Sequence, residues 1–183
     1  MLKGLRQVGK TFSLRKFANE NYDNVVYINF KIETEIKKAI EYNLNVDNII
    51  RNLSFMKIES KFVPNKTVLI FDEIQECSGA RSSIKSFMED GRFDVMASGS
   101  LLGLKGYNRK YRGGVATGYE HVVYMKPMDF EEFLWAKGMA KNDIEYLKEC
   151  FNKREKISVS VHETMLKYFR IIKRESSVIQ FSI

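Results

Sequence analysis

A chain of 183 residues is long enough for one α/β domain with a hydrophobic core and too short for two full-sized domains. Hydrophobic residues make up 44% and charged residues 29%, a balance that excludes a disordered chain. The formal net charge of +7 suits nucleotide phosphates or nucleic acid as partners. A basic surface that only keeps the protein dissolved explains the same surplus.

The sequence also argues against a membrane or exported protein. The longest apolar runs, such as Val68–Phe71, are far shorter than the roughly 20 residues of a membrane-spanning helix. Polar residues interrupt the N-terminus where a secretory signal would stand. Cys77 and Cys150 lie far apart without a CxxC partner, which excludes a disulfide scaffold. We therefore expect a cytoplasmic protein without a membrane partner.

Short β-rich runs alternate with amphipathic stretches along the chain. The runs that predict strands are 25–30, 67–71, 93–97 and 121–125, and the run 67–71 is typical of a strand buried on both faces. Helix-spaced apolar residues predict helices over 11–20, 34–42, 46–58 and 81–89. This alternation predicts an α/β fold, with a parallel sheet and helices on both faces.

The last third of the chain has a different pattern. Asp129 and Glu132 form a capping-box-like pair ahead of an apolar segment, which predicts a helix start. From about Asn142 onward the pattern is helical alone. We expect a small helical appendage after the α/β core.

The most informative motif lies at the start of the chain. It fits the Walker A pattern G-x-x-x-x-G-K-[ST] in full and consists of Gly4, Leu5, Arg6, Gln7, Val8, Gly9, Lys10 and Thr11. Its glycines let the backbone N–H groups wrap a phosphate, and the helix that begins there adds the positive end of its dipole. Lys10 is expected to reach the β- and γ-phosphates of ATP, and the Thr11 hydroxyl to hold Mg²⁺. We include Phe12, in the first helical turn, among the nucleotide-binding residues.

A Walker B arrangement follows at Asp72 and Glu73, directly after the apolar strand 67–71. Asp72 is expected to anchor the metal ion, and Glu73 to polarise the attacking water. The alternative is that the two carboxylates only cap the helix that follows.

Two serines, Ser98 and Ser100, follow directly after the next predicted strand, 93–97. In open parallel sheets ligand chemistry gathers at the carboxyl ends of strands, so the hydroxyl of Ser98 or Ser100 is a candidate contact to the γ-phosphate or the attacking water. Capping the next turn is the alternative role of these serines.

These motifs belong to four longer segments, Lys3–Thr11, Phe71–Cys77, Ala97–Gly103 and Met125–Trp135. Together they resemble a large prokaryotic family of AAA-type P-loop ATPases, whose members usually carry a C-terminal nuclease-like domain of unknown function. The resemblance covers most of residues 3–137. It implies an AAA-type core that binds and hydrolyses ATP, with Ser98 or Ser100 in the sensor position.

The chain departs from that family at both ends. Only Met1–Lys3 precede Gly4, where family members have a longer strand, and the resemblance is lost after Phe169. We therefore expect an ATP-binding core over 1–137 with a shortened first strand, a partial helical lid over 138–183, and a chain cut at both ends. A gap in the sheet would leave backbone groups unpaired.

The sequence supports a Mg²⁺-dependent ATPase with an unknown client, and two other functions stay open. One is an ATP-dependent switch with little turnover. The other is nucleic-acid binding by a basic stretch with interleaved tyrosines, residues 105–112. Arg109 or Arg112 in this stretch could also serve a neighbouring subunit of a homo-oligomer as an arginine finger.

Overall fold

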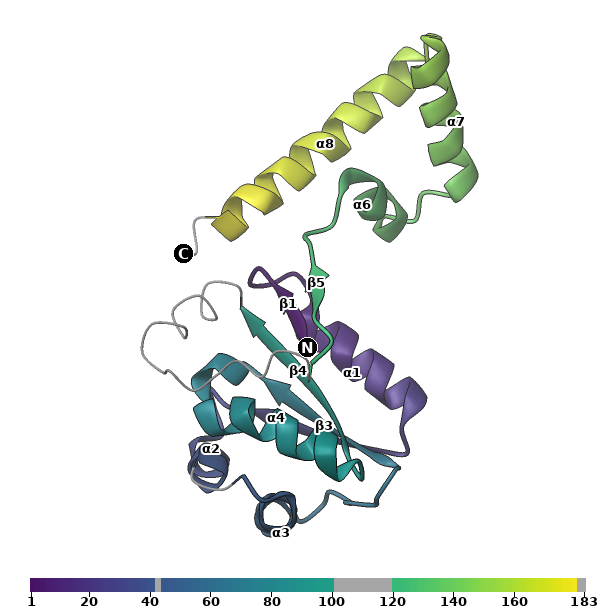
Figure 1. Ribbon diagram of the computed structural model, residues 1–183. Coiled ribbons are helices and arrows are strands. Elements are labelled where there is room, and N and C mark those ends of the chain that lie inside the picture. The colour runs from purple at the N-terminus through teal and green to yellow at the C-terminus, as the bar shows by residue number, and fades with distance from the viewer. Residues whose placement is uncertain (42–43, 101–119, 181–183) are drawn as a thin grey trace. The chain divides into compact units, whose positions relative to one another are not determined.

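The computed structural model describes residues 1–41, 44–100 and 120–180 (Figure 1). The chain divides into two compact units, Met1–Lys126 and Pro127–Ile183. Each unit is described separately below.

The first unit is built on a five-stranded sheet. Its strands run in the order β2-β3-β4-β1-β5, and every neighbouring pair is parallel. The strands are β1 Leu2–Gly4, β2 Asn24–Asn29, β3 Thr67–Asp72, β4 Asp94–Ser100 and β5 Val123–Met125. The predicted parallel sheet is therefore confirmed.

Strand β1 is only three residues long, yet it lies between two partners. Leu2 pairs with Ser98 of β4 on one side and with Val123 of β5 on the other, and Gly4 pairs with Ser100 and Met125. The short strand therefore bridges β4 and β5, and its pairing groups are used on both sides.

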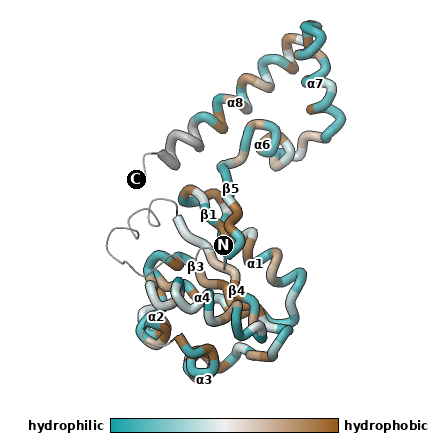
Figure 2. Tube along the Cα trace, in the orientation of Figure 1, coloured by the Kyte–Doolittle hydropathy of each residue, from teal (hydrophilic) through white to brown (hydrophobic). Residues whose placement is uncertain are grey.

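Helices cover both faces of this sheet, as predicted (Figure 1). Val68 and Ile70 of β3 pack with Ala18 of one helix, whereas Leu69 and Phe71 belong to the larger core on the opposite face. Side chains alternate between the two faces of a strand, which explains why β3 is buried along its whole length. The helices are α1 Lys10–Asn21 on one face and α2 Thr34–Glu41, α3 Val46–Met56 and α4 Ser78–Asp90 on the other. Figure 2 shows apolar stretches along the strands and a mixture of apolar and polar residues along these helices.

Helix α4 begins three residues earlier than the sequence pattern predicts. A short 3₁₀-helix, η1 Ile74–Glu76, links β3 to Cys77, which is the N-cap of α4. The Cys77 sulfur accepts a hydrogen bond from the backbone N–H of Ala80 at 3.4 Å. Cysteine is not among the residues that signal an N-cap, so sequence reasoning placed the start too late.

The second unit is helical, with α6 Phe130–Ala136, α7 Lys141–Lys153 and α8 Val159–Gln180. The predicted capping box is present: the Asp129 carboxylate accepts the N–H of Glu132, and the Glu132 carboxylate accepts the N–H of Asp129. Phe133, Leu134 and Ile144 form the core of this unit. Helix α6 thus packs with α7 and α8, whereas the ATP-binding core expected from the sequence extends to residue 137. The assignment of functional domains to 1–137 and 138–183 stays a prediction.

Candidate functional site

The loop that joins β1 to α1 turns sharply before the helix begins. Gly9 is the N-cap of α1 and has a φ of 91°, in the left-handed region that favours glycine. Gln7 also lies in this region, at a φ of 60°, which costs a residue with a Cβ about 1 kcal/mol. Because Gly9 has no side chain, it cannot cap the first-turn N–H groups itself, and these groups are suited to bind an anion.

Gly4 is required for a different reason. A Cβ atom at this position would lie 2.4 Å from the backbone oxygen of Met125 in β5. Only glycine therefore allows β1 and β5 to approach this closely where the loop begins.

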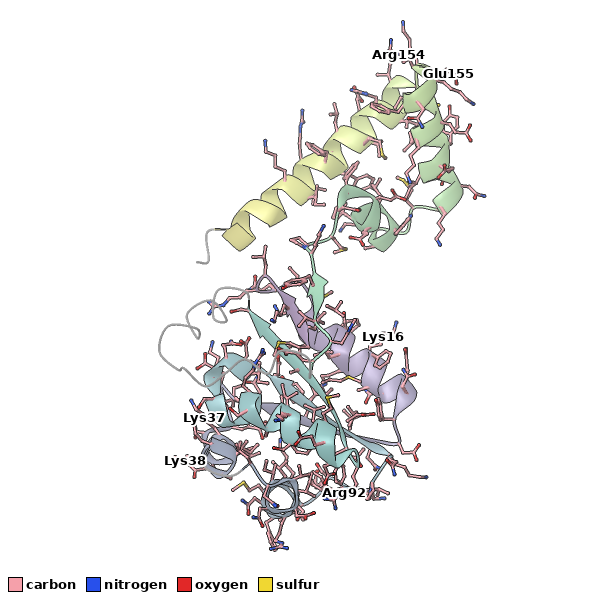
Figure 3. All side chains as sticks on the ribbon, viewed as in Figure 1. Lys16, Lys37, Lys38, Arg92, Arg154 and Glu155 are labelled. Carbon is pink, nitrogen blue, oxygen red and sulfur yellow. The ribbon has the colours of Figure 1, made fainter. Side chains whose placement is uncertain are left out.

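Lys10 is the buried cation of this loop, with a residue exposure of 9%. Its ammonium donates to the backbone oxygen of Gly4 at 3.2 Å and to that of Leu5. Burial lowers the pKa of Lys10, and the nearby Glu73 and Asp72 carboxylates partly oppose this shift. Lys16, on the same helix, is exposed and projects outward (Figure 3). The loop thus holds one positive charge inward, next to its own carbonyl groups.

The remaining predicted loop residues differ in exposure. Phe12 is 72% exposed and Leu5 37% exposed, while Arg6 is exposed and Val8 is half-buried.

Asp72 ends β3 and is buried, with an exposure of 4%. Its Oδ2 accepts hydrogen bonds from the Thr11 hydroxyl at 2.9 Å and the Tyr27 hydroxyl at 2.6 Å. Its Oδ1 accepts from the Ser98 hydroxyl and from the backbone N–H of Glu73, the latter at 3.1 Å. These donors satisfy a carboxylate that would be costly to bury alone. The fold therefore brings together three residues predicted from separate motifs: Thr11, Asp72 and Ser98.

Glu73 follows Asp72 in a left-handed conformation, with a φ of 52°. Its side chain makes no capping hydrogen bond to η1 and instead accepts one from the amide nitrogen of Gln75. Helix α4 is capped by Cys77. The alternative in which Asp72 and Glu73 cap the next helix is therefore wrong.

The two serines of β4 take different positions. Ser98 is 1% exposed and reaches Asp72, whereas Ser100 is 4% exposed and pairs in the sheet with Gly4 at the start of the loop. Both lie at the carboxyl end of β4, where the sequence placed a candidate sensor.

Sequence reasoning missed Tyr27 and Gln75. Tyr27 lies on β2, receives a hydrogen bond from the Asn29 amide at 3.3 Å, and has the guanidinium of Arg15 5.0 Å from its ring centre. Burial is the main cause that raises the pKa of Tyr27 to about 12, and the hydrogen bond to Asp72 is the second cause. The sequence does hold a pattern that could have identified Tyr27. Tyr27 and Asn29 are separated by one apolar residue at the carboxyl end of β2, so both side chains lie on the same face of a strand paired with β3. No comparable pattern distinguishes Gln75.

The basic stretch 105–112, with the candidate arginine-finger residues Arg109 and Arg112, lies outside the described residues. The nucleic-acid and homo-oligomer interpretations stay predictions. Among the described helices, none combines the length and the apolar character that crossing a bilayer demands.

A parallel sheet with a glycine-bounded loop, an inward lysine, and a threonine bonded to the aspartate of a neighbouring strand defines an α/β P-loop NTPase fold. The family model described as an AAA domain matches residues 1–134, and the chain belongs to this family of AAA-type ATPases. Membership makes it a nucleotide-binding protein of the AAA+ ATPase type.

The comparison with solved structures gives a more distant likeness. The ORC2 protein of Aeropyrum pernix, whose structure was solved as ADPNP–ADP complexes, is 15% identical, with a TM-score of 0.46. The match covers 75% of this chain and 44% of that chain, so the chain spans less than half the length of that protein. No curated protein matches the sequence.

Proposed function

We propose that this chain binds ATP together with Mg²⁺ and hydrolyses it. The observation that carries the proposal is the hydrogen bond of 2.9 Å between Thr11 and Asp72, which joins the P-loop to the end of β3. It brings the two predicted metal-binding side chains together beside the loop that would hold the phosphates.

The triphosphate would lie in the loop from Gly4 to Phe12. The N–H groups of the first turn of α1 would donate to its oxygens, and Lys10 would exchange the carbonyl groups of Gly4 and Leu5 for phosphate oxygens. An anion favours the charged lysine, so phosphate would oppose the effect of burial on the pKa of Lys10.

Mg²⁺ would be held by Thr11 and Asp72. Both present oxygen atoms, the ligand type this ion prefers, and they already lie within hydrogen-bond distance of each other. When bound, the ion would neutralise charge that develops on the phosphate oxygens. Tyr27 and Ser98 would keep the Asp72 carboxylate in place.

Glu73 would act as the general base. The attacking water would give a proton to its carboxylate while the water oxygen bonds to the γ-phosphorus and the bond to the ADP leaving oxygen breaks. Ser98 or Ser100, at the end of β4, would contact the γ-phosphate.

The test is Glu73→Gln, which keeps the shape of the side chain and removes the base. We expect phosphate release to fall by at least about 100-fold, the lower range for general base catalysis, while ATP affinity stays within about twofold. The matched control is Glu76→Gln on the exposed side of η1, which should leave both quantities unchanged. Equal phosphate release by Glu73→Gln and the wild type would contradict the assigned base.

A further inference from the structure

The Gln75 side chain is half-buried, and the two polar atoms of its amide have different surroundings. Its amide nitrogen donates to the Glu73 carboxylate, and its amide oxygen is buried with no hydrogen-bond partner in the described part of the chain. An ionised carboxylate can accept hydrogen bonds but cannot donate them, so the amide nitrogen of Gln75 must be the atom that faces Glu73. Burying an amide oxygen without a donor is unfavourable, and an apolar side chain would avoid that cost.

The backbone around Gln75 is held firmly. Ile74 and Cys77, on either side, are fully buried, and the N–H of Glu76 donates to the backbone oxygen of Glu73 at 2.9 Å. Gln75 therefore projects from a short 3₁₀-helix anchored in the larger core. The backbone that carries the Gln75 amide is therefore held in place relative to Glu73.

Glu73 itself is restrained at two further points. Its backbone takes the left-handed conformation, which is unfavourable for glutamate, and its N–H donates to Asp72 at 3.1 Å. The hydrogen bond from Gln75 adds a restraint on the carboxylate group. Backbone and side chain of Glu73 are thus both oriented relative to Asp72.

We propose that Gln75 is the positioning residue for Glu73. The amide of Gln75 fixes one oxygen of the Glu73 carboxylate, so that the other oxygen is directed to the attacking water. This inference rests on the proposed ATPase function. It assigns no contact with nucleotide to Gln75, which acts through Glu73 alone. An undirected carboxylate would spend less time in the orientation that accepts the proton.

The primary test is Gln75→Leu, which keeps most of the volume and removes the donor. We expect kcat for ATP hydrolysis to fall at least tenfold while the KM and the Kd for ATP stay within twofold. In a Glu73→Gln background, the same substitution should change kcat less than twofold, because the group it positions is gone. Glu76→Gln is the control on the same 3₁₀-helix.

The second variant, Gln75→Glu, preserves shape and places a carboxyl group against Glu73. A protonated Glu at this position can donate as the amide does, whereas an ionised one repels Glu73. The ratio of its kcat to that of the wild type should therefore fall as pH rises. A purely structural role for Gln75 would leave this ratio independent of pH.

Several results would overturn the inference. A Gln75→Leu protein with the kcat of the wild type would do so. A Gln75→Leu protein in which kcat and ATP affinity fall in proportion would also do so. A constant activity ratio for Gln75→Glu across pH, or full additivity with Glu73→Gln, would also contradict it. Turnover by the wild type is measured first: a wild type that binds ATP without releasing phosphate contradicts the proposed hydrolysis, whereas an active wild type matched by Gln75→Leu contradicts only the role of Gln75.

Discussion

At the scale of single residues, the Asp72 carboxylate organises the candidate site. Its donors come from three other elements, with Thr11 on α1, Tyr27 on β2 and Ser98 on β4, besides the N–H of Glu73. A buried carboxylate with this many donors supports the fold as well as the proposed metal site, because removing a donor leaves an ion less well compensated.

Tyr27→Phe tests this arrangement through stability. We expect the free energy of unfolding near neutral pH to fall by on the order of 1–2 kcal/mol, since a hydrogen bond to a charged group is lost. The measurement is urea unfolding, with Tyr124→Phe on the exposed side of β5 as the control.

The pH dependence of Tyr27→Phe gives a second readout. The native pKa of Tyr27 is raised to about 12, above the value of about 10 for an unfolded chain. Between these two pKa values the unfolded state releases the phenolic proton and the native state keeps it. The contribution of Tyr27 to the free energy of unfolding is therefore fully present below about pH 10 and is lost as the pH rises towards about 12. Tyr22, whose pKa is also raised to about 12, adds to this decline. Tyr27→Phe should make the decline shallower, and an unchanged slope would refute the assignment.

At the scale of elements, the short strand β1 depends on its neighbours. Three residues form a strand here because β4 and β5 offer pairing groups on both sides. The end of β1 approaches β5 so closely that Gly4 is in contact with the backbone of Met125. The sheet geometry and the start of the loop are therefore fixed by the same residue.

Gly4→Ala measures the cost of disturbing that approach. Its Cβ would meet a backbone oxygen, which cannot move aside as a flexible side chain would, so we expect a loss of about 3 kcal/mol in the free energy of unfolding. Gly91→Ala is the comparison: its Cβ meets open space but its φ is 72°, so it should cost only about 1 kcal/mol. An equal or smaller loss for Gly4→Ala would show that β1 and β5 are not held this closely.

The elements also show what the sequence can predict. Strands β2 to β5 and the helices of the first unit have local patterns of apolar residues, and the expected ranges agree with them within a few residues. For the second unit the sequence predicted a helix start at Asp129 and helical structure from about Asn142 onward, without separate bounds for α7 and α8. Two sequence motifs predicted that Thr11 and Asp72 would meet. Strand β1 was too short to carry a pattern, and Tyr27 meets Asp72 only because β2 lies beside β3. Such contacts depend on pairing across the sheet, which no local window of sequence contains.

At the scale of the whole molecule, several lysines of the described residues lie outside the candidate site. Lys16, Lys37 and Lys38 project from the surface in Figure 3, and Lys38 forms an exposed ion pair with Glu35 at 2.8 Å. Exposed pairs of this kind contribute little to stability. Lys10 differs from them because it is buried in the P-loop, and its charge has a specific use if a phosphate enters.

The most direct measurement is thermal unfolding of the full chain with and without Mg-ATP, for the wild type, Lys10→Ala and the exposed control Lys16→Ala. A ligand that binds only the native state raises its stability by about 2.7 kcal/mol at a hundredfold excess over Kd. We predict this stabilisation for the wild type and for Lys16→Ala, and its loss in Lys10→Ala. An equal shift in wild type and Lys10→Ala, or no shift in the wild type, would contradict an ATP site built on this loop.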